Sequence, residues 1–562
     1  MFPRKSVLLL LLAMIMVSLA LRYPLVEHER FQTDSYFIHI LSNDIVREGQ
    51  AAWTFNSLSY VGYYPFSYPS GVPFLLAELS LLTGMNVDVS ILLVDGILAT
   101  LFCLVVFCLA REFVQRVEFG LLIALITAIA PRFVDTTYWN GSARGMGVVL
   151  ITLCVFVLLR ASFSRSNMLF VISGLIGVGC FAVHHMAVMI ILFGVGYVFA
   201  VLSVRYLPRV FQNRGKRWAA LSAVSIGVIG TIVAMNYFEL LGNSLQAFGE
   251  EGFFVVKNPV IAALSNLVVS YTHQIGIVLV FAAFGAIAFL KAPRFFVRGM
   301  LPLTILIVFV PVLGSSLYVS MLISPFVATM GVAWLRDLGK SKRVKTKTFT
   351  AVLAIVLVLS LTTTVLSVDR WNRVRQLTGD SVEVDNLVFN DATYLNLNDR
   401  GIYAVCNGEA LVGELSAYSN TSFIVSGVVA TISKDVTKRD IQNNITASST
   451  PFPGNLYSWY SYKDTSLVGR FVIVLMSNGV SITRGVTEPF FRDYVASHSN
   501  LLVVVDNSWP TEYASVYGQL GAPFLSEVRN SQASTPGHED LVSYCTYVSQ
   551  RSTMYMVRLP LT

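Results

Sequence analysis

Long apolar runs recur through the first two thirds of the chain and stop at Asp369. A helix needs roughly 20 apolar residues to cross the hydrocarbon core of a bilayer, and this pattern predicts about eleven such helices. They lie near 6–22, 88–110, 117–132, 145–161, 167–186, 187–204, 218–240, 264–290, 299–315, 317–335 and 349–368. Residues 1–369 are therefore predicted to form a polytopic α-helical membrane domain.

The pattern changes after Asp369, where short β-rich runs alternate with polar helical stretches. The run Leu501–Val505 is continuously apolar, which suits a strand buried on both faces of a sheet. Residues 370–562 are thus predicted to form a separate α/β domain. Its strands are expected at 401–406, 423–429, 471–476, 501–506, 544–549 and 554–559, and its helices near 408–418, 433–442, 487–498 and 511–519.

Composition agrees with this division. The 562 residues are 54% hydrophobic and only 13% charged, whereas soluble proteins have about a quarter charged residues. A wholly soluble, disordered or collagen-like protein is excluded. Residues 1–369 carry 26 Lys and Arg against 16 Asp and Glu, and the tail carries 14 against 17. Because the basic excess belongs to the apolar part, no nucleic-acid partner is expected.

The placement of basic residues predicts the orientation of the chain. Of the 26 Lys and Arg before residue 370, 20 fall in loops on the side of the N-terminus, and such loops are usually cytoplasmic. We therefore expect a multi-pass protein of the cell membrane with an extracytoplasmic tail and a retained first helix. The sequons at Asn140, Asn420 and Asn444 also fall on the outer side. Cys406 and Cys545 in the tail are either a disulfide or two separate buried thiols.

The first outer loop combines an amphipathic stretch with a rigid turn. Apolar side chains at 38, 41, 45 and 46 predict a helix along the membrane surface, which Gly49 would end. Aromatic residues and prolines crowd residues 63–73. The next apolar run, 74–83, is too short to span and is predicted to be re-entrant or interfacial.

Four segments of this loop carry a family resemblance: Asp34-Ser35-Tyr36, Val46-Arg47-Glu48-Gly49, Tyr64-Pro65 and Tyr68-Pro69-Ser70-Gly71. Their order and spacing resemble the GT-C superfamily of membrane glycosyltransferases, above all the catalytic subunit of oligosaccharyltransferase and its archaeal relatives. The resemblance covers about residues 1–160. It implies a GT-C-like fold for the membrane domain.

The resemblance also implies an activity. The enzyme would transfer a sugar or glycan from a polyprenyl (dolichyl-type) phosphate or diphosphate to a protein, glycan or lipid acceptor at the outer face. Asp34 would be the catalytic carboxylate, close to the acceptor or to a metal. A carboxylate at the headgroup plane can take a proton or hold a cation. The alternative is that Thr33 or Asp34 caps the surface helix.

The second outer loop departs from the family. Oligosaccharyltransferases have a close pair of acids here that helps to hold the metal, whereas Asp135 is the only acid between residues 131 and 145. If Mg²⁺ or Mn²⁺ is bound, Asp34 and Asp135 are the candidate ligands. The tail also lacks the family's Trp-Trp-Asp-Tyr-Gly string. Transfer to asparagine sequons is therefore not supported.

Three further residues are candidates for binding the donor phosphate. Arg144 opens the fourth predicted span, where helix amides also favour anions. His184 and His185 end the fifth span on the same side. The alternatives are an interfacial arginine anchor and ordinary helix-end polarity. Asp95, Glu239 and His273 are further ionisable residues in or beside spans. Polar side chains at membrane depth usually face a cavity, and Asp95 is expected to face the same cavity as the histidines.

Two other functions fit a polytopic membrane protein. A transporter or flippase of lipid-linked sugars should show paired broken helices in two similar halves, and the sequence shows no such halves. A non-catalytic envelope scaffold would leave the polar outer loops without a role. The sequence therefore favours a glycosyltransferase, with the flippase as the alternative.

Overall fold

The structure is a computed structural model, and it divides into two compact units, which are described separately below. The first unit comprises residues 1–24 and 93–373, and the second comprises residues 25–92 and 374–562. The structure describes residues 4–23, 33–49, 71–114, 116–211, 271–291, 295–309, 319–339, 346–377, 386–398, 403–406, 414–415, 417–419, 423–425, 500–506, 542–549 and 552–558.

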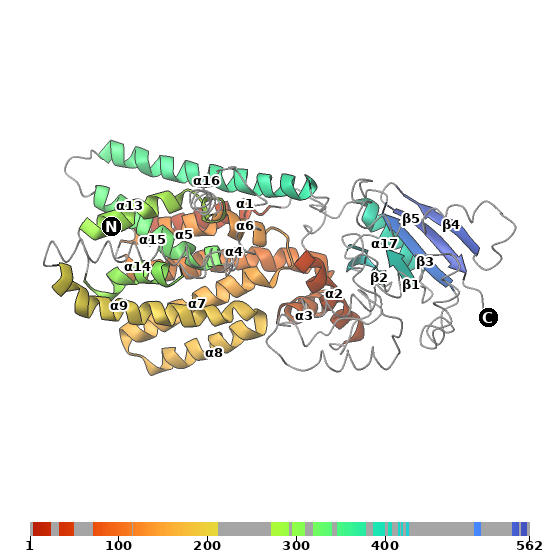
Figure 1. Cartoon of the computed structure of the whole chain (residues 1–562), viewed down its shortest axis with the longest axis horizontal. Helices are drawn as coiled ribbons and strands as arrows, with labels where there is room; N and C mark the ends of the chain where they lie inside the picture. The colour runs from red at the N-terminus through yellow and green to blue at the C-terminus, as the bar shows by residue number, and fades with distance from the viewer. Residues whose placement is uncertain are drawn as a thin grey trace, which may run out of the picture. The chain divides into compact units, whose positions relative to one another are not determined.

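The first unit is a bundle of helices (Figure 1). Neighbouring pairs pack along their lengths: α7 with α8, α9 with α14, and α13 with α15. The helices are α1 (Arg4–Ala20), α4 (Val87–Phe113, from residue 93 on), α5 (Val117–Ala128), α6 (Pro131–Thr136), α7 (Ala143–Ser164), α8 (Asn167–Val183), the 3₁₀ turn η2 (His185–Val188), α9 (Met189–Phe211), α13 (Val278–Lys291), α14 (Val297–Phe309), α15 (Val319–Gly339) and α16 (Thr346–Leu377).

Ten of the predicted spans overlap these helices, those at 264–290 and 299–315 only in their described parts, and the span at 218–240 lies outside the described residues. Within the described part, five helices are long and apolar enough to cross a membrane: 87–113, 143–164, 186–208, 319–338 and 351–371. The membrane domain is therefore a multi-pass helical one. The total of eleven spans stays a prediction.

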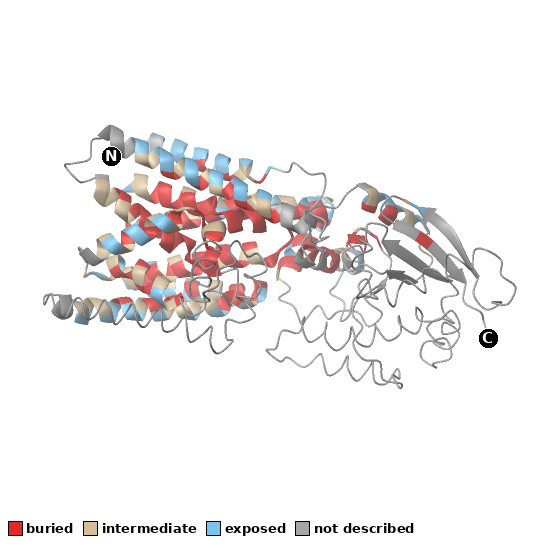
Figure 2. Ribbon diagram, turned by 45° about the horizontal axis from the view of Figure 1, so that its top comes forward, coloured by how far each residue is buried: buried red, intermediate tan, exposed pale blue. Residues whose placement is uncertain are grey.

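Buried residues gather along the middle of the bundle and exposed residues lie on its outer helices (Figure 2). Many of the exposed residues are large and apolar, such as Leu175, Ile191 and Val358. α15 is the central helix, because 83% of its most apolar stretch is buried, against 22% for α9 and α16. Phe193 anchors the core, with ring centroids 4.8 Å from Phe309 and 5.6 Å from Phe326. The apolar outer surface is the one expected to face lipid.

The second unit contains two helices of the first outer loop and the tail. α2 (Thr33–Glu48) ends at Gly49, whose φ of 69° is a left-handed conformation that glycine adopts readily. This confirms the predicted amphipathic helix and its end. α3 (Gly71–Thr83) has 13 residues, which is too short to span a bilayer. The Tyr-Pro-rich turn before it lies outside the described residues.

The tail holds α17 (Asn386–Asn398) and a mixed five-stranded sheet. The strands are β1 (Tyr403–Cys406), β2 (Phe423–Val425), β3 (Asn500–Asp506), β4 (Val542–Val548) and β5 (Ser552–Arg558). Their order is β2-β1-β3-β5-β4. β1 is parallel to β2 and β3, and β5 is antiparallel to β3 and β4.

Each of these strands falls on a predicted strand. The sixth, 471–476, and the helices at 433–442, 487–498 and 511–519 lie outside the described residues. α17 is additional to the prediction. The α/β sandwich and the domain boundary after Asp369 stay predictions.

The sheet decides between the two interpretations of the tail cysteines. Cys406 is in β1 and Cys545 is in β4, and β3 and β5 lie between these strands. Three strand spacings put the two residues roughly 14 Å apart, whereas a disulfide needs Cα atoms within about 7 Å. The strand order therefore argues against a disulfide between Cys406 and Cys545.

Candidate functional site

The second outer loop folds into the bundle and does not project from it. Pro131 starts α6 at the helix position that proline favours, and all six residues of α6 are buried. Trp139 takes a left-handed φ of 48° and is 6% exposed. The loop ends at Ser142, whose hydroxyl accepts a hydrogen bond of 3.3 Å from the Arg144 amide and so caps α7.

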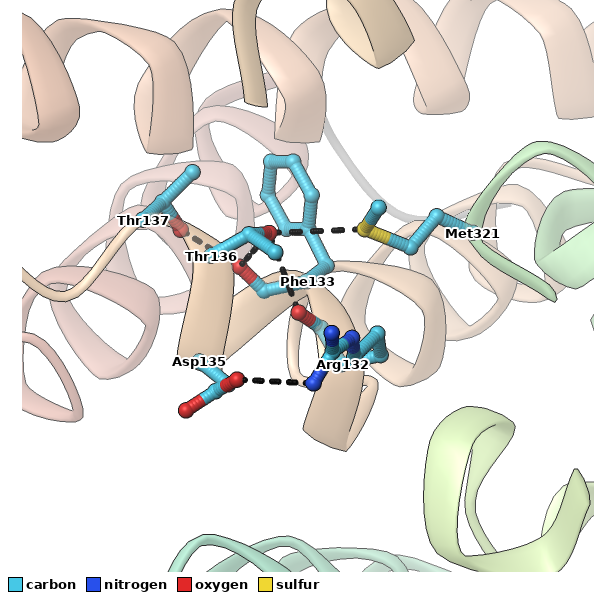
Figure 3. A network of polar contacts seen from close by, with 6 residues as sticks. All are labelled: Arg132, Phe133, Asp135, Thr136, Thr137 and Met321. Carbon is cyan, nitrogen blue, oxygen red and sulfur yellow. Dashed lines mark hydrogen bonds and ion pairs between the residues drawn. The ribbon is translucent and has the colours of Figure 1, made fainter. Parts of the chain in front are cut away.

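Asp135, the candidate second acid, is held by Arg132 on the same helix (Figure 3). A guanidinium nitrogen of Arg132 lies 3.0 Å from Asp135 Oδ2, and Asp135 is fully buried. The guanidinium also lies over the Trp371 ring at 5.3 Å, so that α6 contacts the C-terminal part of α16. Asp135 is thus charge-compensated within the protein.

The ion pair between Arg132 and Asp135 affects whether Asp135 can bind a metal ion. A cation at Asp135 would compete with Arg132 for the carboxylate. Among the described residues there is also no group of three or more His, Cys, Asp or Glu side chains that could hold a metal ion. Asp135 therefore does not fit the role of metal ligand in this arrangement.

Arg22, just after the end of α1, links the loop to α1 and to the end of α5. Its guanidinium donates to Thr137 Oγ1 at 2.7 Å, to Ser18 O and Oγ at 2.8 and 2.9 Å, and to Ala128 O at 3.3 Å. It also lies 5.0 Å from the centre of the Phe133 ring. A buried arginine with so many donors engaged fixes the ends of α1 and α5 against the loop. In the sequence, Arg22 could have been recognised as a candidate because it is a charged residue at the end of an apolar run.

Asp95 of α4 contacts the same loop, and its predicted place in the donor cavity stays a prediction. It is buried, and its Oδ2 accepts a hydrogen bond of 2.7 Å from the Asn140 backbone amide. Asn140 is only 1% exposed. The sequon at Asn140 is therefore inaccessible in the folded chain and gives no support for the predicted orientation.

His273 belongs to a polar cluster at the same end of the bundle. Arg370 and the Nε2 atom of His273 are 3.1 Å apart, and Nδ1 is 2.9 Å from Ser367 Oγ. Arginine only donates, so Nε2 must accept, and the ring proton is assigned to Nδ1. His273 thus links α16 to the residues before α13.

Two of the candidate phosphate ligands, Arg144 and His184, lie near the start of α7. Arg144 is the second residue of α7 and is partly exposed. Gly147 lies one turn further along the same face, and a Cβ at Gly147 would lie 3.1 Å from Cβ of His184. Gly147 therefore makes room for His184 beside the face that carries Arg144.

His184 is buried, and its Nδ1 accepts a hydrogen bond of 3.1 Å from the Met186 amide. A neutral His184 then carries its proton on Nε2, which makes that atom a donor. His185 is the first residue of η2, and its side chain lies outside the described part. Asp34 lies in the first turn of α2, in the second unit. Its side chain is not described, so its place beside Arg144 stays a prediction.

No known family's sequence profile matches the chain, and no curated protein matches it. Solved structures do. The *Archaeoglobus fulgidus* oligosaccharyltransferase tethered with an acceptor peptide containing the NVT sequon aligns over 99% of this chain and 74% of its own, with a TM-score of 0.58 and 12% identity. The same organism's AglB, in complex with an inhibitory peptide and a dolichol-phosphate, aligns over 98% and 74%, with a TM-score of 0.54 and 13% identity.

ArnT from *Cupriavidus metallidurans*, in the apo state, aligns over 98% of both chains with a TM-score of 0.51 and 12% identity. These neighbours are GT-C glycosyltransferases. The resemblance found in the first outer loop is therefore confirmed at the level of the fold.

Proposed function

We propose that this chain, which has the fold of the GT-C membrane glycosyltransferases, transfers a sugar or glycan from a polyprenyl phosphate or diphosphate to an acceptor at the outer face of the membrane. The proposal depends mainly on the arrangement of side chains at the start of α7. There Arg144 follows a capped helix N-terminus, and His184 packs against the same face. Two cationic or donor groups at a helix N-terminus suit a phosphate.

The physical setting favours a lipid-linked donor. A polyprenyl tail stays in the bilayer, so its phosphate must lie at the headgroup plane. The buried polar loop at 131–142 provides a preorganised wall there, because its charges are already paired. Solved GT-C neighbours of this fold include one described with dolichol-phosphate, which supports a lipid phosphate as the ligand class.

The proposed reaction uses residues of this chain. The acceptor nucleophile attacks the anomeric carbon and forms the new glycosidic bond while the bond to the phosphate oxygen breaks. Arg144, with His184 or His185, stabilises the charge that develops on the leaving phosphate. Asp34 takes the proton that the acceptor loses. Asp135 has a structural role in this scheme, holding Arg132.

A solved neighbour contains zinc and sulfate, and the family resemblance implies a divalent cation. A bound Mg²⁺ or Mn²⁺ would supply further charge neutralisation at the phosphate. We propose Asp34 as the residue that would hold it, since Asp135 is engaged by Arg132.

The test is incubation of the purified protein with radiolabelled polyprenyl-phosphate and polyprenyl-diphosphate sugars and candidate protein, glycan and lipid acceptors. Label should move from the lipid to an acceptor, and the Asp34→Asn protein serves as the control. Movement of intact labelled lipid between leaflets without cleavage would instead support the flippase.

A further inference from the structure

A cavity of about 390 Å³ lies at the opposite end of the bundle from the second outer loop. Arg111 on its wall is 16 residues along α4 from Asp95, which is about 24 Å of helix. The volume is within the range of about 300–1,000 Å³ that small-molecule sites occupy. It is formed by α4, α5, α13, α14 and α15, all in the first unit.

The charged lining of this cavity is unbalanced. Four arginines, Arg111, Arg116, Arg298 and Arg336, line it with two acids, Glu112 and Asp337. The formal excess is two positive charges. Arg336 pairs with Asp337 at 3.2 Å, and buried Glu112 pairs with Arg298 at 3.3 Å and with Arg160 at 3.1 Å. Both acids are thus already engaged by arginines.

Two helix N-termini add to the positive field. α5 begins after Arg116, which makes no side-chain hydrogen bond to the helix end, and α14 begins at Val297, beside Arg298. Residues of both first turns line the cavity. The free amides and the dipole of a helix N-terminus favour an anion. The arginine side chains and the two helix N-termini therefore all make this cavity electrostatically positive.

The remaining wall is aromatic and apolar. Phe119, Phe289 and Trp334 line the cavity, and Trp334 stacks on Phe281 and Phe284 of α13 with centroids at 5.7 and 5.4 Å. An inorganic anion alone needs no such wall. A phosphate that carries a hydrocarbon chain would place its charge among the arginines and its chain against the rings.

We infer that this arginine-lined cavity binds a phosphate group, carried by an anionic lipid of the leaflet on this side of the membrane. This site is distinct from the proposed donor site at the start of α7. The excess of basic residues on this side predicts that the leaflet is cytoplasmic.

The variant for the test is Arg111→Gln/Arg116→Gln. Arg116 is exposed and makes no side-chain capping bond to α5, and Arg111 donates a long hydrogen bond of 3.5 Å to the Val114 carbonyl. Neither change leaves Glu112 or Asp337 without its ion-pair partner. Arg116→Gln alone is the second variant, in case the double change impairs folding. The matched control is Arg165→Gln/Arg205→Gln, which removes the same charge from exposed residues on the same side outside the cavity.

The experiment measures the retention of phosphatidic acid, phosphatidylcholine or inorganic phosphate by the detergent-purified full-length chain, using native mass spectrometry. Phosphatidic acid should bind the wild type and the control alike, and the double variant about tenfold more weakly or worse. Phosphatidylcholine should bind weakly. If inorganic phosphate displaces the lipid from the wild type, the phosphate site stands and a soluble phosphate can also fill it. Equal retention of phosphatidic acid by the wild type, both variants and the control would overturn the inference.

Discussion

The side-chain amide of Asn43 donates a hydrogen bond of 2.8 Å to the backbone carbonyl of Ala417, which is 374 residues further along the chain. Beside it, the His39 ring meets the Tyr418 ring edge-on at 5.0 Å, and Tyr418 in turn contacts Phe389 of α17 at 5.3 Å. The helix that carries Asp34 is therefore held by the tail. We therefore propose that the tail positions the first outer loop.

Removing that contact should loosen α2. We expect Asn43→Ala to cost about 1 kcal/mol of local stability, the usual net value of one hydrogen bond, and to lower transfer activity through the position of Asp34. Hydrogen exchange of residues 33–48 measures the first effect. The control is Asn396→Ala, which removes a bond of 3.0 Å from α17 to the Tyr418 carbonyl and no hydrogen bond made directly by Asn43. Unchanged exchange in the Asn43→Ala protein would show that the tail does not hold the helix.

Asp34 is predicted to take the acceptor proton. Asp34→Asn should leave the thermal unfolding temperature near that of the wild type and reduce turnover by about 10²–10⁴-fold, the usual contribution of a positioned base. Asp44→Asn, on the same helix, is the control for a general change of charge. Near-normal turnover by a folded Asp34→Asn protein would assign Asp34 to capping α2 instead.

Arg144 is predicted to bind the donor phosphate. Arg144→Ala should raise the KM for the lipid-linked donor by about tenfold or more, since a charge-assisted bond is lost, and should leave the KM for the acceptor unchanged. Ser142→Ala is the structural control, because it removes only the cap of α7 and costs about 1 kcal/mol. An equal effect of both substitutions on donor KM would mean that Arg144 acts as an interfacial anchor.

The ion pair of Arg132 and Asp135 is predicted to be structural. Asp135→Asn leaves the Arg132 charge buried without its partner, which should cost about 3–5 kcal/mol and lower the thermal unfolding temperature. The double change Arg132→Met/Asp135→Leu should restore much of that loss, since it removes both charges together. If Asp135→Asn instead keeps its stability and loses only divalent-cation dependence, Asp135 is a metal ligand after all.

Local pattern was enough to predict some of these features. The period of apolar residues over 38–46 and the glycine at 49 encode α2 directly, because amphipathicity and left-handed φ are properties of a few neighbouring residues. Arg144 and His184 were singled out in the same way, as polar residues at the ends of predicted spans, and their roles stay predictions.

The partners of these residues were not predictable in this way. The bond from Arg22 to Thr137 crosses 115 residues, and the Arg132–Trp371 contact crosses more than 200. Such pairs depend on how whole helices pack against one another, and the periodicity of apolar residues does not determine that packing. Asp135 shows the consequence. Its residue type suggested a ligand, whereas its neighbour one turn earlier makes it half of an ion pair.

The last prediction concerns the side of the membrane on which the tail lies. α2 follows α1 after a dozen residues, and α2 contacts the tail, so we expect the tail on the side of the membrane where α1 ends. The first unit agrees, because the ends of α1 and α16 both contact the loop at 131–137 through Arg22 and Trp371. This argument does not depend on the number of spans between them. The basic residues then predict that this side is extracytoplasmic.

Single cysteines at exposed positions test this, in a background whose own six cysteines are replaced. Arg47→Cys on α2 and Val548→Cys on the tail should both react with a membrane-impermeant maleimide in intact cells or spheroplasts, whereas Arg205→Cys at the other end of the bundle should react only after lysis. If residues 47 and 548 are both protected until lysis, the predicted orientation is inverted but the contact stands. If only one of them is labelled in intact cells, α2 and the tail lie on opposite sides of the membrane, and the tail cannot position Asp34.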